Sequence, residues 1–493
     1  MKKISRFIPW FIIIPGILLR VREYLSNRSL WVDEALLVNN IIDRNFLELL
    51  KPLSIDQHAP VGFLFVERFI FLLFGNSSEY VFRIFPLVCG IVSLFLFKKL
   101  AERIFPKVYA YLALAIFAFS DLQIRYSTEL KQYSSEVLVQ LSLYLLVTKF
   151  SLEKLMVKKW WFILAIGSLT LVFSHTAILT LTAFSILTLI QFVRVKNWKK
   201  ILPQVLIFTV WIIVFAFLYL KDAVSAYTDK AFVNAWPYFN LIPVSFDQVL
   251  ANIGGFYSII FDLLGNFSAL IGIILFFIGS ALWFKKERVL CLLFLLPLIL
   301  GLIASGLQKY PYVTRVFLYT TPAIILSIIF AAEWLVGKIK GRRKIIVYSV
   351  LAISLLIGSS NLASTHLFNP RQIEEFKPAL EYYLANREPE DFLYVYYAAE
   401  SPMKYYAQRY NLNPGEYIIG KMSRNNWIKY ISEINSLSSK KRVWFLFYHV
   451  IINRMTPNGP IGEEEYILNH LNKLGRLESK LQLTGASIYL YSF

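Results

Sequence analysis

Residues 269–284 read ALIGIILFFIGSALWF, a run without a single charged side chain. A second uncharged run, IFTVWIIVFAFLY, occupies residues 207–219. Of the 493 residues, 57% are hydrophobic, whereas soluble domains are about 45–50% apolar. A helix needs about 20 mostly apolar residues to cross a bilayer, and roughly ten to twelve such segments precede residue 363. The sequence therefore predicts a membrane protein built mainly of transmembrane helices.

The net charge of +19 is distributed unevenly along the chain. From residue 364 onward there are 15 Lys and Arg against 13 Asp and Glu, so most of the excess lies before that point. A basic excess can indicate nucleic-acid binding. Here the basic residues stand in short blocks between apolar runs, which is typical of cytoplasmic helix ends, and we expect no nucleic-acid partner. Cys89 and Cys291 lie in apolar segments and predict neither a disulfide nor a zinc site.

The basic blocks predict the topology, because two cytoplasmic blocks must be separated by two crossings. An apolar N-terminal segment, interpreted as an uncleaved span, supplies the first of eleven membrane helices. Segment 60–74 is not counted, since it is short and carries Glu67 and Arg68 at its centre, where a charge costs at least about 2.5–3.5 kcal/mol. We expect an interfacial or re-entrant helix there. The other predicted spans are about 80–98, 107–123, 133–149, 160–174, 176–193, 201–220, 263–284, 289–307, 316–337 and 345–362.

This topology places the N-terminus in the cytoplasm and divides the chain into a transmembrane domain, 1–363, and an extracytoplasmic domain, 364–493. Outer loops are expected at 22–79, with interfacial helices, at 121–133, and at about 221–262. The tail alternates helical and strand patterns, which predicts a small α/β domain. It contains no nucleophile elbow, phosphate loop or metal spacing, so we expect a lid or an acceptor scaffold. The predicted tail helices are 372–386, 401–410, 425–437 and 463–474, and the strands are 391–397, 442–448 and 487–491.

Two polar groups lie in the first outer loop. Asp33 and Glu34 follow the first span; adjacent acids can act as a general base, bind a metal, or simply begin a helix whose dipole favours acids. His58, in the stretch Asp56-Gln57-His58-Ala59-Pro60, can bind phosphate or relay a proton, or cap an interfacial helix.

The second outer loop reads RYSTELKQY over residues 125–133. Arg125 and Lys131 flank Glu129; cations stabilise a phosphate leaving group and a carboxylate orients a hydroxyl, although a basic helix end would look the same. Arg315 stands at the outer mouth of the predicted span 316–337, where it needs an anionic partner, either a phosphate or a carboxylate. His175 lies in the turn between two spans, as a turn residue or a headgroup contact.

In this order, the motifs resemble those of polytopic C-type glycosyltransferases, in the branch of the protein O-mannosyltransferases and aminoarabinose transferases. The resemblance is strongest over about residues 1–180. Lys131 departs from the family, where Arg is commoner, and a lysine lacks bidentate phosphate recognition. Ala59-Pro60-Val61-Gly62 departs as well, because relatives usually show Pro-Pro and an aromatic. The resemblance is carried by Trp31, Asp33, Glu34, His58, Pro60, Phe74, Gly75, Arg83, Pro86, Tyr126, Ser127, Glu129, Lys131, Tyr133, Ser174, His175, Arg315 and Pro322.

The resemblance implies a C-type glycosyltransferase fold, a lipid-phosphate donor and an active site on the outer face. Asp33 would be the catalytic base, with Glu34 nearby and Glu129 as a second acid. A divalent metal, Mg or Mn, is allowed at Asp33 and Glu129 but not required. The donor phosphate is expected to contact Lys131, Arg315, Arg125 and His58, and the substrate to contact Tyr126, Tyr133 and His175.

The sequence thus predicts an enzyme of the cytoplasmic membrane that serves glycan biosynthesis in the cell envelope. It would transfer a hexose or pentose from a polyprenyl-phosphate donor, with inversion, to a hydroxyl of a protein, lipid or glycan. The chain has no Walker motif or Rossmann fingerprint, and a lipid-phosphate leaving group needs neither. Two alternatives stay open. One is a polysaccharide ligase or polymerase with a lipid pyrophosphate-linked glycan, and the other is a lipid or sugar transporter, which would favour inverted repeats and charges near the midplane.

Overall fold

The computed structural model describes residues 7–55, 57–75, 78–149, 160–228, 236–450, 452–456 and 459–493. The chain divides into two compact units. The domain boundary was predicted at residue 363. In the structure the C-terminal part of the second unit begins at Arg371, and this unit also includes two earlier segments from the first outer loop. The first, helical unit comprises Met1–Ser26, Phe46–Phe69 and Arg83–Pro370, and the second comprises Asn27–Asn45, Ile70–Phe82 and Arg371–Phe493.

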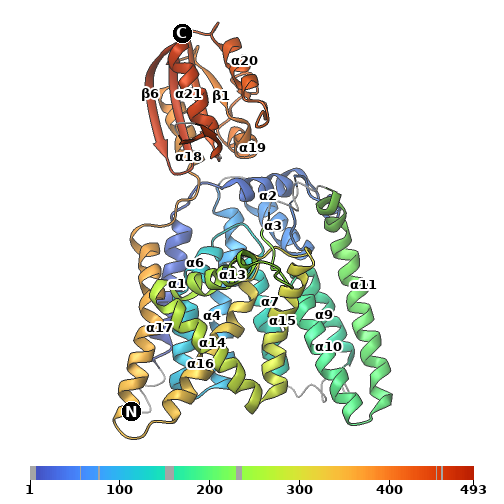
Figure 1. The fold of residues 1–493 in the computed structure, drawn as a ribbon. Helices are drawn as coiled ribbons and strands as arrows, with labels where there is room; N and C mark the ends of the chain where they lie inside the picture. The colour runs from blue at the N-terminus through green and yellow to red at the C-terminus, as the bar shows by residue number, and fades with distance from the viewer. Residues whose placement is uncertain are drawn as a thin grey trace. The chain divides into compact units, whose positions relative to one another are not determined.

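Each predicted span contains at least one helix of the first unit, although some boundaries differ (Figure 1). The segment excluded from the span count is helical too, as α3, while its place in the interface stays a prediction. The helices are α1 (Trp10–Leu25), α3 (Val61–Phe74), α4 (Ile84–Ile104), α5 (Lys107–Phe119), α6 (Asp121–Tyr126), α7 (Tyr133–Lys149), α9 (Trp160–Phe173), α10 (Ala177–Arg194), α11 (Trp198–Thr228), α13 (Phe246–Leu264), α14 (Asn266–Lys286), α15 (Arg288–Gly306), α16 (Thr321–Gly337) and α17 (Arg343–Phe368).

Seven helices within the described residues are long and apolar enough to cross a membrane, and α5 and α9 are apolar but shorter. In α17 only 11% of the most apolar window is buried, and in α11 only 17%. Such exposed apolar faces are stable in lipid and costly in water. The protein is therefore a membrane protein, while the number of eleven crossings and their orientation stay predictions.

Two helix boundaries differ from expectation. The predicted span 107–123 is broken at Ser120, where extended backbone ends α5 and a new helix, α6, begins. The third outer loop, expected at about 221–262, contains α13, which was not predicted and which Ser245 caps by accepting the Gln248 N–H at 3.3 Å. Gly254 and Gly255 interrupt its amphipathic pattern and weaken the helical signal in the sequence.

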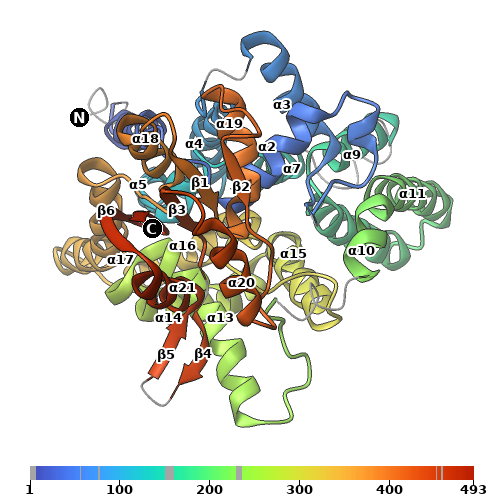
Figure 2. The same ribbon diagram turned by 90° about the horizontal axis from the view of Figure 1, so that it is seen from above.

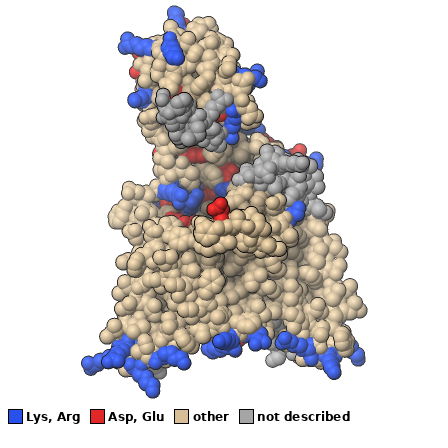
Figure 3. Space-filling model, viewed as in Figure 1, with Lys and Arg blue, Asp and Glu red and all other residues tan. Residues whose placement is uncertain are grey.

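Lys and Arg side chains gather at one end of the helical unit, where α4 meets α5, α14 meets α15 and α16 meets α17 (Figures 1 and 3). This arrangement is the one that the positive-inside rule predicts. Lys2, Lys3 and Arg6, together with the lysines at 154, 158 and 159, lie outside the described residues. The helix α6 lies at the opposite end of the unit (Figure 1).

The helices α14 and α16 pack closely through a glycine. A Cβ atom on Gly279 would lie 1.8 Å from the backbone oxygen of Ser327. In a membrane, where no hydrophobic effect draws helices together, small residues allow the close contact that gives van der Waals stabilisation.

The second unit contains a five-stranded sheet in the order β2-β1-β3-β7-β6. The strand β1 (Phe392–Val395) pairs in parallel with β2 (Tyr417–Ile419) and β3 (Arg442–Tyr448). The strand β7 (Ala486–Ser492) pairs antiparallel with β3 and with β6 (Arg476–Leu483). A separate hairpin joins β4 (Ile452–Thr456) and β5 (Gly459–Gly462).

Helices cover both faces of this sheet. Alternate strand residues such as Tyr394 and Phe445 form a buried cluster with α20 (Ile428–Leu437) and α21 (Glu463–Leu474). Trp444 and Tyr448 point to the other face, where their rings contact α18 (Phe376–Asn386). Figure 2 shows α18 and α21 flanking the strands. The period-2 alternation of strand side chains explains why both faces need a cover.

The predicted tail elements are all present, as α18, β1, α19 (Glu400–Arg409), α20, β3, α21 and β7. The strands β2, β4, β5 and β6 were missed. The sequence of β6, RLESKLQL, is polar, and its residues are mostly exposed because it forms an edge of the sheet. A polar edge strand protects a sheet from pairing with other chains but gives little signal in a sequence.

The helix α2 (Val32–Asp43), which carries Asp33 and Glu34, belongs to the second unit. It packs against α19. Asn39 Nδ2 donates to the Ser401 carbonyl at 2.9 Å, and Lys404 Nζ lies 2.5 Å from Asp43 Oδ2. The tail therefore holds the helix that bears the predicted base.

The segment Ile70–Phe82 is anchored in the second unit by the buried carboxylate of Glu79. Lys377 Nζ lies 3.3 Å and Arg409 Nη1 2.6 Å from its oxygens. Tyr406 Oη also donates to it, at 2.8 Å. Burial disfavours the charged carboxylate, but the two cations outweigh burial and lower the pKa of Glu79.

Glu79→Gln is expected to destabilise the second unit by about 1.5–3 kcal/mol, the usual value of hydrogen bonds to a charged group. Because the folded pKa is depressed, the carboxylate stabilises the fold above its ordinary pKa and loses this effect as the pH falls through the folded pKa. Thermal unfolding in detergent should therefore show the largest difference from wild type near pH 7 and a smaller one near pH 4.

Glu416→Gln is the matched control, since Glu416 forms an ion pair with Arg387 that is about one-third exposed on both sides. Exposed pairs contribute about 0–1 kcal/mol. Equal losses for the two variants, or a loss at Glu79 that does not change with pH, would contradict the assignment.

Candidate active site

The second outer loop builds a compact charged cluster at the end of α6. Arg125 Nε lies 3.8 Å from Glu129 Oε2, and the Glu129 side chain is fully buried. The guanidinium also stacks over the Tyr126 ring at 5.0 Å. Thr128 and Ser127 donate their hydroxyls to backbone carbonyls of α6, which turns the chain sharply after Tyr126. This turn brings Glu129 back toward Arg125.

Lys131 has the neutral side-chain amide of Gln57 among its partners. Its Nζ donates to Gln57 Oε1 at 2.7 Å, and the residue is only 5% exposed. The next residue, Gln132, donates to the His58 carbonyl at 3.3 Å. The Gln57 amide oxygen accepts one hydrogen bond from the ammonium and helps to fix its position. These two bonds bring Gln57 and His58 beside the second outer loop, while a phosphate contact for His58 stays a prediction.

Burial and nearby charges shift the pKa values of Arg125 and Tyr126. Burial disfavours the charged guanidinium, but Tyr126, Glu129, Asp121 and Asp262 outweigh it and hold the pKa of Arg125 above its ordinary value. Burial and then Glu129 raise the pKa of the Tyr126 hydroxyl, while Arg125 and Arg315 oppose the rise. Arg315 therefore lies within electrostatic reach of Tyr126, and its guanidinium also stacks 5.2 Å from the Trp236 ring. The Tyr133 ring meets Tyr126 edge-on at 5.2 Å.

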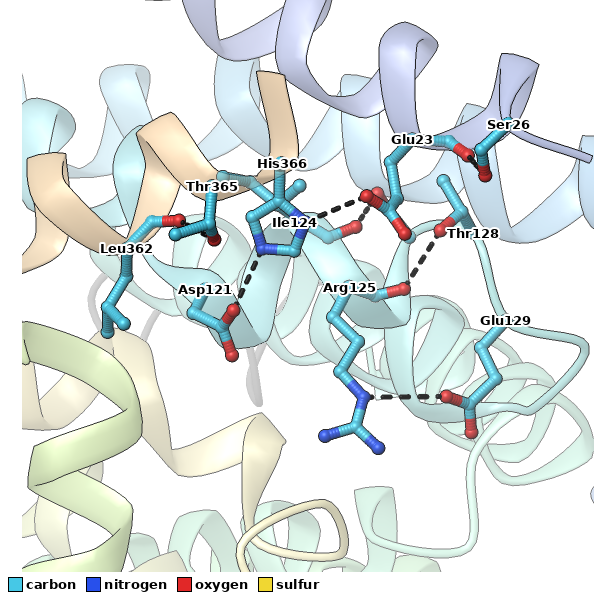
Figure 4. A network of polar contacts seen from close by, with 11 residues as sticks. Glu23, Ser26, Asp121, Ile124, Arg125, Thr128, Glu129, Leu362, Thr365 and His366 are labelled. Carbon is cyan, nitrogen blue, oxygen red and sulfur yellow. Dashed lines mark hydrogen bonds and ion pairs between the residues drawn. The ribbon is translucent and has the colours of Figure 1, made fainter. Parts of the chain in front are cut away.

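Behind this cluster lies a chain of two carboxylates and a histidine (Figure 4). His366 Nδ1 is 2.8 Å from Glu23 Oε2, and Nε2 is 2.8 Å from Asp121 Oδ1. The three residues come from α17, α1 and α6, so the contact ties three helices together. The contact orients the start of α6 at Asp121. Arg125, near the end of the same helix, points toward Glu129 (Figure 4).

His175 has a different environment from the charged cluster. Its ring meets Tyr219 of α11 edge-on at 5.7 Å. Its backbone N–H, with that of Thr176, donates to the buried carboxylate of Glu136 on α7. These contacts join α7, α10 and α11 at the turn before α10. A substrate contact for His175 stays a prediction.

Asp33 and Glu34 have unequal environments in the first turn of α2. Glu34 is fully buried and accepts the Trp31 N–H at 3.4 Å, as the returning half of a capping box does. Asp33 is half-buried. Glu34 thus stabilises the start of the helix, and Asp33 is the more exposed acid of the pair.

A carboxylate of the tail also touches the start of α2. Glu374 Oε2 accepts the Val32 N–H at 2.9 Å, and Oε1 pairs with His449 Nδ1. The hydrogen bond from Glu374 is the main cause that raises the pKa of His449; burial and Arg424 oppose it, and Asp33 adds to it.

Among the described residues, no three His, Cys, Asp or Glu side chains are gathered as a metal site requires. Glu129 is instead engaged with Arg125. The metal at Asp33 and Glu129 therefore stays a prediction, and no step below depends on it.

Several contacts of the site were missed from the sequence. The chain has five histidines, and two that were passed over, His366 and His449, each contact a carboxylate. Asp262 lies at the end of α13, a helix that was not predicted. A histidine just beyond an apolar span, such as His366, was the one available signal.

The helical unit and the ordered polar motifs define the fold of the polytopic C-type glycosyltransferases, and the resemblance predicted from the sequence is confirmed. Residues 57–220 match the family described as dolichyl-phosphate-mannose-protein mannosyltransferase. This range, a third of the chain, includes His58, Arg125, Glu129, Lys131 and His175. A search of curated proteins finds no match.

Solved structures share the fold at low sequence identity. ArnT from Cupriavidus metallidurans in the apo state matches with a TM-score of 0.53 and 10% identity over 97% of both chains. ArnT bound to undecaprenyl phosphate matches with a TM-score of 0.51 and 10% identity, over 97% of this chain and 98% of that one. The Archaeoglobus fulgidus oligosaccharyltransferase in complex with Zn and sulfate matches with a TM-score of 0.50 and 15% identity, over 88% of this chain and 67% of that one.

Proposed function

We propose that the protein transfers a sugar from a polyprenyl-phosphate-linked donor to an acceptor hydroxyl on the outer face of the cytoplasmic membrane. The observation that carries the proposal is the pair of buried cations in the second outer loop. Lys131 is 5% exposed and bound to a neutral amide, and Arg125 is mostly buried beside Glu129. Both lie in the range that matches the mannosyltransferase family, and a structure of the same fold was solved with undecaprenyl phosphate bound.

The cations bind and stabilise the phosphate of the donor. As the bond between the anomeric carbon and the phosphate oxygen breaks, negative charge develops on that oxygen. Lys131, Arg125 and Arg315 stabilise this charge best where water is excluded, because charge–charge energies grow as the dielectric constant falls. Glu129 orients the Arg125 guanidinium and limits the net positive charge when no donor is bound.

Asp33 serves as the base. Its carboxylate accepts the proton of the acceptor hydroxyl, and the hydroxyl oxygen attacks the anomeric carbon from the side opposite the phosphate. A new C–O bond forms as the C–O–P linkage breaks at the carbon, so the configuration inverts and polyprenyl phosphate leaves with the electron pair. Binding the acceptor hydroxyl and the anomeric carbon in the reactive orientation contributes much of the rate. The bound reactants have already lost their translational and rotational entropy before the chemical step.

The test uses purified protein in detergent with a panel of radiolabelled monosaccharides on polyprenyl phosphate. Sugar release or transfer from one of these donors is the expected result and identifies the sugar. The same sugars on nucleoside diphosphates serve as the control and should remain intact. Folded protein that turns over none of the lipid-phosphate donors would overturn the proposal.

A second candidate is transfer of a lipid-linked oligosaccharide, favoured by the match to the Archaeoglobus fulgidus oligosaccharyltransferase. A polyprenyl-pyrophosphate oligosaccharide in the same assay separates the two candidates, since the first predicts turnover only with the monosaccharide monophosphate.

A further inference from the structure

The carboxylate of Glu374 joins the start of α2 to the tail. Glu374 is 8% exposed. One of its oxygens accepts the Val32 N–H at 2.9 Å, and the other pairs with His449. Val32 directly precedes Asp33, so the bond acts on the first turn of the helix, where backbone N–H groups lack helical partners.

His449 and Glu375, the residue that follows Glu374, are both hydrogen-bonded to the turn between β6 and β7. The His449 N–H donates to the Gly485 carbonyl at 3.1 Å, and the Glu375 N–H donates to the Thr484 carbonyl at 2.8 Å. Gly485 has φ +65°, and a Cβ atom there would lie 2.9 Å from Glu374 Cγ. The turn therefore needs glycine for its backbone and for the room that it leaves to Glu374.

The electrostatics of this corner include the predicted base. The charged groups that face the His449 ring are Glu374, Asp33 and Arg424. The His449 ring therefore lies within electrostatic reach of Asp33.

Contacts other than the Glu374–His449 pair also attach α2 to the tail. The far half of the helix is held by Asn39 to the Ser401 carbonyl and by Asp43 to Lys404. Before the helix, the Leu30 N–H donates to Tyr406 Oη at 3.0 Å. Losing the pair would therefore loosen the first turn while α2 stays docked.

We propose that Glu374 and His449 are positioning residues for Asp33, which makes the C-terminal α/β segment part of the transfer machinery rather than only a lid. The inference rests on the proposed role of Asp33 as base. Glu374 holds the first turn of α2 in one orientation, and His449 holds Glu374. An orientation error of the base lowers the rate of the chemical step and leaves the binding of the donor phosphate unchanged.

The experiment compares Glu374→Ala, Glu374→Gln and His449→Gln with wild type. We expect kcat to fall about 10–100-fold in Glu374→Ala, with the donor KM and the affinity for polyprenyl phosphate within about twofold of wild type. Glu374→Gln should recover part of the rate, because its amide oxygen can still accept the Val32 N–H. His449→Gln should lie between the two. Lys404→Gln, at the far end of α2, is the matched control and should retain wild-type kcat.

Hydrogen exchange gives a second readout that needs no activity. In Glu374→Ala, a peptide covering residues 30–37 should exchange faster, while one covering 39–45 keeps the wild-type rate. Wild-type kcat and exchange in Glu374→Ala would overturn the inference, as would equal losses of kcat and donor affinity, or Glu374→Gln no better than Glu374→Ala.

Failure of the proposed function gives a different result from failure of the positioning role. An Asp33→Asn variant that retains full activity would remove the base, and this inference with it. An inactive Asp33→Asn beside a fully active Glu374→Ala would overturn the positioning role alone. If no donor is turned over, the exchange data decide: faster exchange confined to 30–37 supports the positioning contact, and unchanged or helix-wide exchange overturns it.

Discussion

Replacing Asp33 by Asn is expected to slow sugar transfer by about 10²–10⁴-fold, the usual effect of losing a general base. The amide has nearly the same shape as the carboxylate but cannot take the proton of the acceptor. The start of α2 should persist, because Glu34 still accepts the Trp31 N–H and Glu374 still accepts the Val32 N–H. The loss should therefore be in kcat rather than in folding.

The measurement is the single-turnover rate with the donor identified in the panel, beside the melting temperature of each protein. Asp43→Asn is the control, because Asp43 ends the same helix and is 42% exposed in its pair with Lys404. Near-wild-type transfer by folded Asp33→Asn would remove Asp33 from the chemistry.

Lys131→Gln is expected to lower kcat/KM for the donor by about 10²–10³-fold, as removal of one preorganised group at a developing negative charge does. The ammonium is buried, and its hydrogen bond to Gln57 Oε1 fixes its position, so we expect it to act as a preorganised cation for the donor phosphate. Lys131→Arg should lose less, since it keeps the charge while changing its geometry.

Donor dependence is the deciding measurement, with the acceptor saturating. Lys98→Gln is the control, because Lys98 pairs with Glu102 at the end of the helical unit where the basic blocks gather. If Lys131→Gln showed the wild-type donor dependence, or lost acceptor affinity instead, the phosphate role would be wrong.

The parts of the fold that were predictable depend on patterns within one segment. An uncharged run such as 269–284 has few stable states other than a membrane helix, because its backbone must bond internally in lipid. In the tail, the apolar strand RVWFLFY at 442–448 was visible for a similar reason, since it is buried on both faces. The edge strand β6 was not visible, because exposure on an edge removes the apolar pattern.

The candidate site was predictable where its residues lie close together in the chain. Arg125, Glu129 and Lys131 occupy one short loop, and Arg125 and Glu129 are neighbours in the structure. Gln57 was not singled out, because its contact with Lys131 crosses 74 positions of sequence. His366 was missed for the same reason, since its partner Glu23 lies 343 positions away.

The sequence by itself determined the membrane character, the helical segments, the fold class and the identity of the charged residues near each loop. Those properties follow from local hydrophobicity, local charge and the order of motifs. Only the tertiary structure decided which charges are paired, that α2 belongs with the C-terminal tail, and that Glu374 and His449 meet the turn that carries Asp33. Such contacts depend on chain segments hundreds of residues apart, and their energies appear only when burial removes water from both partners.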